Sequence, residues 1–275
     1  MPELEPARKP DRHCLLIDQG NSRLKWIGAV WTARSHNWDL DVTSFGEGQL
    51  EDFTAALDAG EMQPSEEILI CSVALVEKLK MLKGELATRT SAKLTIVKSE
   101  TQSCGISNGY SDPSQLGVDR WMAVLGSACH HGTPCVMMDL GTASTLDAVD
   151  QDGEHLGGLI IPGPETMLNS LGSKTALDIN ERGFPGRLSA TPGQAQKTTA
   201  AAIQWGIATA QSSALQQFVT WVGDQLTEES KENLKVLVTG GAADVIIEPS
   251  DCPLIHDPLL VFKGILCSRF GRGKD

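Results

Sequence analysis

A short polar run in the middle of the chain has the residue types that bind phosphate. Asp139-Leu140-Gly141-Thr142-Ala143-Ser144-Thr145 lies between apolar Val136-Met137-Met138 and Leu146-Asp147-Ala148-Val149, and Asp152-Gly153 then suits a hairpin turn. The pattern predicts a strand, a tight glycine loop and a second strand. In such a loop, backbone N–H groups and two hydroxyls can donate hydrogen bonds to a phosphate. A carboxylate at the end of the strand can hold a cation or a metal-bound water.

The same pattern occurs once more near the N-terminus. Cys14-Leu15-Leu16-Ile17-Asp18-Gln19-Gly20-Asn21-Ser22 has the same order of residue types, and Cys135, Asp139 and Gly141 each follow their counterparts by 121 positions. A single Asp-x-Gly-Thr run is common in capped hairpin turns that bind nothing. A long internal repeat instead predicts two similar halves. We expect two phosphate loops that face each other across a cleft and hold a nucleotide polyphosphate.

Four further residues are candidates for chemistry, and each has a simpler alternative. Lys25 follows the first loop, where its ammonium could reach a phosphate, although an isolated lysine on a strand is usually only solvated. Tyr110 is the only tyrosine and lies in a polar loop, where a ligand role and simple edge packing are both open. Asp119 and Arg120 begin an expected helix. They could serve as a general base and a carboxylate clamp, or could merely cap the helix and form a surface ion pair.

Composition narrows the classes of partner. The chain has 275 residues and a net charge of −12, which argues against nucleic acid or an anionic membrane as the main partner. The seven cysteines have irregular spacing, so neither a disulfide framework nor a zinc site is expected. No signal peptide and no apolar run of membrane-spanning length is visible, and we predict a cytoplasmic protein with reduced thiols and a flexible tail over residues 1–13.

The elements that must position these residues alternate between strands and helices, which predicts an α/β fold. We expect strands over 15–17, 24–31, 38–43, 67–72, 93–97, 136–138, 146–149, 154–164 and 236–239. We expect helices over 49–57, 75–86, 116–130, 166–171, 198–226 and 259–270. In the longest helix, one face is predicted to contain Ile203, Ile207, Ala210, Ala214, Phe218 and Trp221. This face is expected to be buried in the core, although a helix of this length could also form a subunit interface. Residues 178–193 are expected to form a mobile loop that could cover a site.

Five motifs, in this order, resemble those of type III pantothenate kinases. They are Asp18-x-Gly-Asn-Ser-x-x-Lys25-Trp26, Gly117-Val118-Asp119-Arg120, Asp139-x-Gly-Thr-Ala-x-Thr145, Gly157-Gly158-x-Ile-x-Pro-Gly163 and Thr239-Gly240-Gly241. The resemblance implies the acetate/sugar kinase, Hsp70 and actin superfamily fold. That fold has two ribonuclease-H-like halves with mixed five-stranded sheets and flanking helices, placed here at 14–133 and 134–275. It also implies ATP-dependent phosphorylation of pantothenate, the first step of coenzyme A biosynthesis, although members have been described as accessory factors for virulence regulation too.

The resemblance further implies roles for individual residues. The ATP phosphates would be held by Asp18, Gln19, Gly20, Asn21, Ser22, Arg23, Leu24, Lys25 and Thr142. Pantothenate would be bound by Tyr110, Gly117, Val118, Asp119, Arg120 and Thr199, with Asp119 as the proton acceptor. Asp139 would hold a monovalent cation, K⁺ or NH₄⁺, with Mg²⁺ also required. The family is dimeric, with the site near the subunit interface.

Two departures and two rival functions stay open at this point. Ala242-Ala243 stands where an acid is expected after the second glycine turn, and Thr198 competes with Thr199 for the substrate role. Another small-molecule kinase of the superfamily would have the same fold, so fold alone does not decide the substrate. A non-catalytic regulatory protein would bind ATP without turnover.

Overall fold

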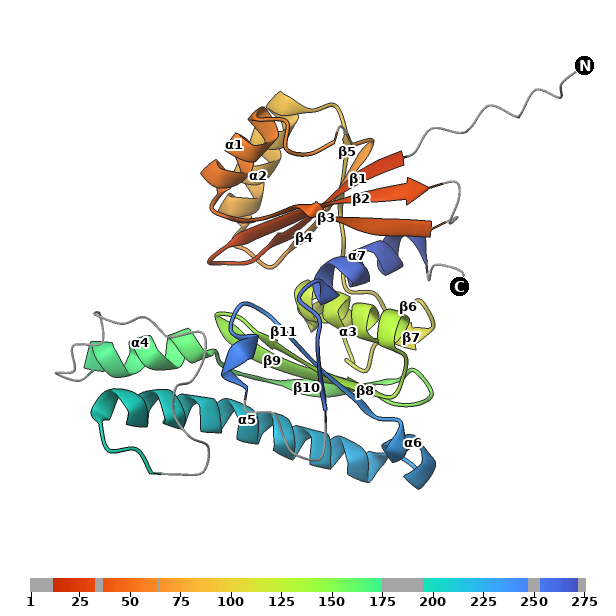
Figure 1. Cartoon of the computed structure of the whole chain (residues 1–275). Helices are drawn as coiled ribbons and strands as arrows, with labels where there is room; N and C mark the ends of the chain where they lie inside the picture. Colours follow the sequence, from red (N-terminus) through yellow and green to blue (C-terminus); the bar gives the residue numbers. More distant parts are fainter. Residues whose placement is uncertain (1–11, 33–36, 64, 175–194, 247–252, 272–275) are drawn as a thin grey trace, which may run out of the picture. The chain divides into compact units, whose positions relative to one another are not determined.

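The computed structural model describes residues 12–32, 37–63, 65–174, 195–246 and 253–271 (Figure 1). The chain forms two compact units. The first unit contains Met1–Glu100, Ser114–Gly126 and Val261–Asp275, and the second contains Thr101–Pro113 and Ser127–Leu260. This division differs from the predicted halves because the last helix packs in the first unit and residues 101–113 pack in the second. The predicted loop over 178–193 lies outside the described residues.

The first unit is built on a five-stranded sheet in the order β3-β2-β1-β4-β5. Its strands are β1 (Arg12–Gln19), β2 (Leu24–Thr32), β3 (Asn37–Gly48), β4 (Glu67–Ser72) and β5 (Lys93–Ile96). β2 is antiparallel to both β1 and β3, whereas β4 is parallel to β1 and to β5. A central strand in this position is buried on both faces, and the continuous apolar run Leu15 to Ile17 meets that requirement.

Two helices cover one face of the first sheet, α1 (Leu50–Asp58) and α2 (Val76–Arg89) (Figure 1). Leu82 and Leu86, one helical turn apart on α2, pack with Phe53 of α1 against Leu15 and Ile17 of β1. The first unit also contains most of α3 (Val118–His131) and of α7 (Leu260–Phe270). The backbones of α3 and α7 touch, because a Cβ on Gly264 would lie 1.8 Å from the carbonyl oxygen of Met122.

The second unit repeats this sheet in the order β10-β9-β8-β11-β12. Its strands are β8 (Cys135–Leu140), β9 (Ala143–Val149), β10 (His155–Pro162), β11 (Lys235–Thr239) and β12 (Leu254–His256). Numbered within each unit, both sheets have the order 3-2-1-4-5, with the second strand antiparallel to its neighbours and the fourth and fifth parallel to the first. The predicted α/β fold with two ribonuclease-H-like sheets is therefore confirmed.

A long helix, α5 (Thr199–Gln225), lies along one face of the second sheet with α4 (Pro164–Lys174) beside it (Figure 1). The predicted helix over 198–226 is confirmed, but its predicted buried face is partly wrong. Ile207 and Phe218 are buried as expected, whereas Trp221 is 45% exposed. The buried stripe is formed instead by Ile207, Ala208, Gln211, Leu215, Phe218 and Val222. Gln211 fits in this stripe because its amide donates a hydrogen bond to the carbonyl oxygen of Pro162, 2.9 Å away.

Smaller elements complete the described chain. They are β6 (Gln102–Ser103), β7 (Ile106–Ser107), α6 (Glu228–Glu232) and two short 3₁₀ turns, Pro113–Gln115 and Ala243–Val245. Within the described ranges, none of the helices combines the length and the apolar character needed to cross a bilayer.

Candidate functional site

The first predicted phosphate loop is a four-residue connection between β1 and β2. The N–H of Gly20 donates to the carbonyl oxygen of Arg23 at 3.0 Å, which closes the loop. Gln19, just before it, is buried, and its side-chain amide is held at both ends. The hydroxyl of Ser72 donates to its Oε1 at 2.9 Å, and its Nε2 donates to the carbonyl oxygen of Lys78 at 3.2 Å. These two hydrogen bonds hold Gln19 in place at the end of β1, where the loop begins.

Side-chain hydrogen bonds from Lys78 of α2, from Gln49 just before α1 and from the loop's own Asn21 hold the rest of this loop. The Nζ of Lys78 donates to the carbonyl oxygen of Asn21, and the side-chain amide of Asn21 donates to Val73 O at 3.4 Å. Gln49, the residue before α1, donates from its Nε2 to Ser22 O at 3.1 Å. These contacts fix the loop without using its backbone N–H groups. Lys78 and Gln49 were not identified from the sequence, because they lie far along the chain, one in an ordinary helix and the other just before one.

The structure places Lys25 directly opposite Asp18 in the β1–β2 pairing. Residues directly opposite in an antiparallel pair point to the same face of the sheet, so the two side chains share one face beside the loop. On its other side Asp18 is paired with Cys71 of β4. Burial raises the pKa of the Cys71 thiol, and the nearby carboxylates of Asp18 and Asp119 raise this pKa further. Asp119 therefore lies in the same neighbourhood as the first loop.

Gly117 to Arg120 form the N-terminal turn of α3. The N–H of Trp121 donates to Gly117 O at 2.9 Å, and the hydroxyl of Ser99 donates to Leu116 O at 2.7 Å. Asp119 Oδ1 accepts a hydrogen bond from its neighbour's backbone, the N–H of Arg120, at 2.8 Å. A Cβ on Gly117 would lie 2.7 Å from this same Oδ1, so glycine leaves the space that the carboxylate occupies. Asp119 thus combines this backbone contact with a carboxylate that acts on the same buried thiol as Asp18.

The second predicted loop is shorter than the first, with only Gly141 and Thr142 between β8 and β9. The N–H of Gly141 donates to Ala143 O at 3.1 Å. The carbonyl oxygen of Thr142 accepts two hydrogen bonds, from Gly163 N–H at 3.0 Å and from the Thr166 hydroxyl at 2.6 Å. The start of α4 therefore fixes the backbone at Thr142, whose residue surface is exposed.

Asp139 lies against a glycine turn that follows β11. Gly240 has φ +92, and a Cβ there would lie 2.4 Å from Asp139 Oδ1 and 2.6 Å from Leu140 O. The backbone nitrogen of Leu140 also lies 2.6 Å from this point, so two oxygens and one nitrogen line a small cradle that any side chain on Gly240 would fill. Oxygen donors suit hard cations. No group of three or more His, Cys, Asp or Glu side chains that could hold a metal ion occurs among the described residues. One carboxylate oxygen and one carbonyl oxygen offer two donors, which suits a cation of low charge.

The two remaining predicted substrate residues lie in the second unit. Tyr110 is half-buried and stacks on the ring of His155, with ring centroids 6.0 Å apart. Thr198 is the N-cap of α5, and its hydroxyl accepts a hydrogen bond from Ala201 N–H at 3.3 Å. This contact gives Thr198 a structural role and leaves Thr199 as the stronger candidate for the substrate.

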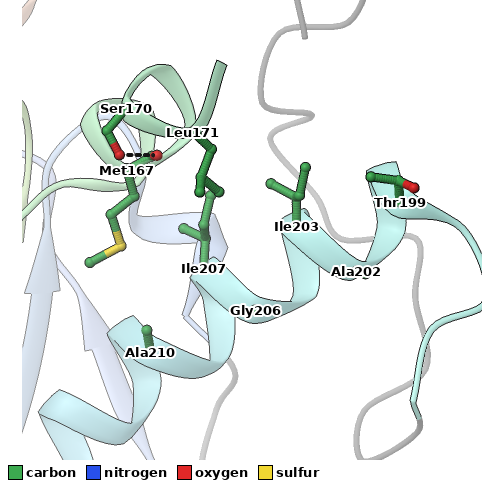
Figure 2. Close-up of a pocket in the computed structure, with 9 residues that line it drawn as sticks. All are labelled: Met167, Ser170, Leu171, Thr199, Ala202, Ile203, Gly206, Ile207 and Ala210. Atoms are coloured by element: carbon green, nitrogen blue, oxygen red, sulfur yellow. Dashed lines mark hydrogen bonds between the residues drawn. The ribbon is translucent and has the colours of Figure 1, made fainter. Parts of the chain in front are cut away.

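Thr199 lines a groove of about 520 Å³ between α4 and α5 (Figure 2). The lining residues are Met167, Ser170, Leu171, Thr199, Ala202, Ile203, Gly206, Ile207 and Ala210. None of them is charged, so this groove does not suit phosphate and instead suits an apolar group. Met167, Leu171, Ile203 and Ile207 point into it (Figure 2).

Comparisons with known proteins identify the family that has these features. The family model described as type III pantothenate kinase matches residues 14–220. A type III pantothenate kinase of Thiobacillus denitrificans is 33% identical over 259 residues, covering 91% of this chain and 94% of that protein. One from Cellvibrio japonicus is 34% identical over 261 residues, covering 91% and 94%. The solved structure of a conserved Baf family protein from Campylobacter jejuni is similar in fold, with TM-score 0.54 at 19% identity, covering 91% of this chain and 94% of that chain.

Proposed function

The chain belongs to the type III pantothenate kinase family, and from this premise we propose how its residues phosphorylate pantothenate. The enzyme transfers the γ-phosphoryl group of ATP to the hydroxyl of pantothenate, in the first step of coenzyme A biosynthesis. The observation that carries this assignment is the family match over 14–220, which includes both glycine loops and Gly117 to Arg120. We propose the cytoplasm as its location.

The first loop, from Asp18 to Lys25, binds the ATP phosphates together with Thr142. Phosphoryl transfer depends on alignment and charge neutralisation more than on covalent chemistry. A protein with a net charge of −12 must supply local cations for a polyphosphate. Lys25 meets this need at the loop exit, and the contacts of Lys78 and Gln49 keep the loop in one conformation.

Asp119 takes the proton of the pantothenate hydroxyl. Its Oδ1 is held by the Arg120 N–H at 2.8 Å, so the carboxylate has a defined orientation before substrate arrives. A positioned general base contributes about 10²–10⁴-fold to the rate. Arg120 is the candidate for binding the pantothenate carboxylate, and at 5% exposure its charge is poorly screened by water. Tyr110, Gly117, Val118 and Thr199 complete the substrate contacts.

Asp139 holds the monovalent cation, K⁺ or NH₄⁺, in the cradle beside Gly240. A bound cation supplies positive charge that offsets the charge of ATP, and Mg²⁺ accompanies the nucleotide. The support for this site is the donor set: one carboxylate oxygen and one carbonyl oxygen, both within 2.6 Å of the point that a Gly240 Cβ would occupy.

The active form is a homodimer with its site near the interface. The support is apolar surface on the second unit, where Ile160 of edge strand β10 is 62% exposed and Leu171 at the α4–α5 groove is 39% exposed. Sedimentation should give twice the mass of the 29.4 kDa chain, and Ile160→Asp should lower that mass if β10 lies in the interface. A monomer at micromolar concentration would contradict the proposal.

The decisive assay measures phosphate transfer to pantothenate with Mg²⁺-ATP, in potassium buffer and then in sodium buffer. We expect product with potassium and little with sodium. Asp119→Asn should lower kcat by at least 10²-fold. Its structure should persist, because the amide oxygen can still accept the Arg120 N–H. Asp224→Asn, at an exposed position on α5, is the matched control and should leave the rate unchanged.

The alternatives give different results in the same assay. ATP consumption with a sugar or acetate, but none with pantothenate, would indicate another kinase of the superfamily. ATP binding without turnover on any acceptor would indicate a regulatory protein. Equal product in both buffers would keep the kinase and remove the cation role of Asp139.

A further inference from the structure

Two buried ionisable side chains of the second unit have no place in the mechanism above. His155, at the start of β10, has a side chain with no exposed surface, and Asp147 of β9 is 2% exposed at its side chain. The ring nitrogen Nε2 of His155 lies 2.9 Å from Asp147 Oδ1. Burying an imidazole and a carboxylate is unfavourable unless they are paired, so this contact fixes both groups. Removing both groups from water costs solvation free energy, so the pair is expected to have a role that offsets this cost.

The hydrogen bond to Asp147 sets the orientation of the imidazole ring. A carboxylate accepts, so Nε2 carries the proton that it donates. The other ring nitrogen, Nδ1, is buried and has no hydrogen-bond partner in the described part of the chain. It is 3.8 Å from the point that a Cβ on Gly109 would occupy. The carboxylate thus orients the ring from one side, in the same way that carboxylates orient metal-binding histidines through the ring nitrogen that does not bind the metal.

The loop that carries Tyr110 rests directly on His155. A Cβ on Gly109 would lie 1.9 Å from the carbonyl oxygen of His155, so the two backbones are in contact. The Tyr110 ring stacks on the imidazole with an angle of 14° between the planes and centroids 6.0 Å apart. Offset stacking of this kind has a preferred geometry, so the plane of one ring constrains the other. The N–H of Tyr110 donates to Asn108 Oδ1 at 3.0 Å, and Ser107 N–H donates to Gly153 O at 2.9 Å.

We propose that His155, oriented by Asp147, is a positioning residue that holds the Tyr110 ring in the plane in which it contacts pantothenate. This inference rests on the proposed function, because it takes Tyr110 as a pantothenate contact. His155 itself does not touch substrate. Its contribution is to reduce the number of ring orientations that substrate binding would otherwise have to select.

Tyr110 is the only tyrosine of the chain, so its state can be observed without measuring activity. Biosynthetic replacement of tyrosine by 3-fluorotyrosine gives one protein ¹⁹F resonance. We expect pantothenate to shift this resonance in the wild-type protein. We expect His155→Gln, which keeps an amide donor for Asp147 but removes the ring, to move and broaden the resonance of the unliganded protein. His256→Gln, at an exposed position of the second unit, is the matched control and should leave it unchanged.

Steady-state kinetics separates positioning from a general structural defect. His155→Gln should raise KM for pantothenate about 3- to 10-fold, the range expected for one aromatic pair, and leave KM for ATP unchanged. In a double-mutant cycle with Tyr110→Ala, the double variant should be no worse than Tyr110→Ala alone. If His155→Gln does not fold, Gly109→Ala tests the same platform, because it lifts the loop from His155 and should give the same selective rise in KM.

The outcomes are distinguishable. A wild-type resonance that responds to pantothenate, together with an unchanged resonance and KM in His155→Gln, overturns the inference and leaves the proposed function standing. Additive effects in the cycle, or a rise in both KM values, assign His155 a structural role only and also overturn it. No pantothenate response and no phosphorylation by the wild-type protein would overturn the function and this inference together.

Discussion

Replacing Gly163 with alanine tests whether close backbone packing positions the second phosphate loop. A Cβ on Gly163 would lie 2.0 Å from Gly141 O and 2.9 Å from Thr142 O. These are backbone atoms, so they cannot rotate away as the end of a flexible side chain can. Gly163→Ala must therefore move the loop that carries Thr142, or move the junction of β10 and α4. Either movement also disturbs the hydrogen bond from Gly163 N–H to Thr142 O, which is 3.0 Å long.

The size of the effect follows from this geometry. To bring the added carbon to an ordinary contact distance, the two segments must separate by about 1.5 Å. Misplacement of a positioning group by about 1 Å can cost roughly 10²-fold in rate. Overpacking at a tight site destabilises a protein by about 1–3 kcal/mol. We therefore expect kcat/KM for ATP to fall about 100-fold, with a measurable drop in Tm.

The assay is the initial rate of ADP release at varied ATP and saturating pantothenate, beside a thermal melt. Gly223→Ala is the matched control, because no atom lies within 4 Å of a Cβ at this helical position. That control should keep wild-type kinetics and stabilise the protein by up to about 1 kcal/mol. Wild-type kinetics in Gly163→Ala would refute the reasoning, since the loop would then tolerate the displacement or would not bind ATP.

Two further predictions concern the first unit and the repeated cysteines. Lys25→Met should raise KM for ATP about 10- to 100-fold and leave KM for pantothenate unchanged, because a charge-assisted hydrogen bond to phosphate is lost. Lys25→Arg should retain much of the affinity for ATP. Equal KM values for ATP in Lys25→Met and the wild-type protein would exclude a contact between Lys25 and phosphate. Burial raises the pKa of Cys14 and of Cys135 to about 12, so the native state keeps protons that the unfolded state releases above about pH 9. The contribution of each thiol to the free energy of unfolding should be fully present below pH 9 and fall between pH 9 and 12, by on the order of 1 kcal/mol per pH unit. Urea unfolding at several pH values measures this decrease. If the free energy of unfolding of Cys135→Ala fell with pH as steeply as that of the wild-type protein, the prediction would be contradicted.

The internal repeat was the most informative signal in the sequence. The offset of 121 positions between Cys14 and Cys135 predicted two similar halves, and the structure gives their two sheets the same strand order. Gly163 packs on the second loop, and Gly240 packs on the end of β8 that leads into it. What each glycine touches could not be predicted, since those contacts join segments that are distant in the chain.

Other features were beyond the reach of sequence patterns for physical reasons. Helix α5 is apolar on more than one face, so periodicity alone could not choose between the stripe that contains Trp221 and the one that contains buried Gln211. The two-residue strands β6 and β7 are too short for an alternating pattern to appear. The pairing of His155 with Asp147 depends on how β9 and β10 lie together, whereas their types and spacing resemble those of many unpaired residues.

The placement of α7 has a consequence for how the protein is made. Arg269 forms an ion pair with Glu67 of β4 at 3.3 Å, and Gly264 touches the backbone of α3. The sheet that leaves the ribosome first thus lacks part of its packing until the last helix has been synthesised. At about 5–20 residues per second, the first unit waits on the order of ten seconds or more for Val261 to Phe270. A stop codon before Val261 would remove few residues but leave the packing of the earliest-made sheet incomplete, so chains truncated there should be targets for chaperones and proteases.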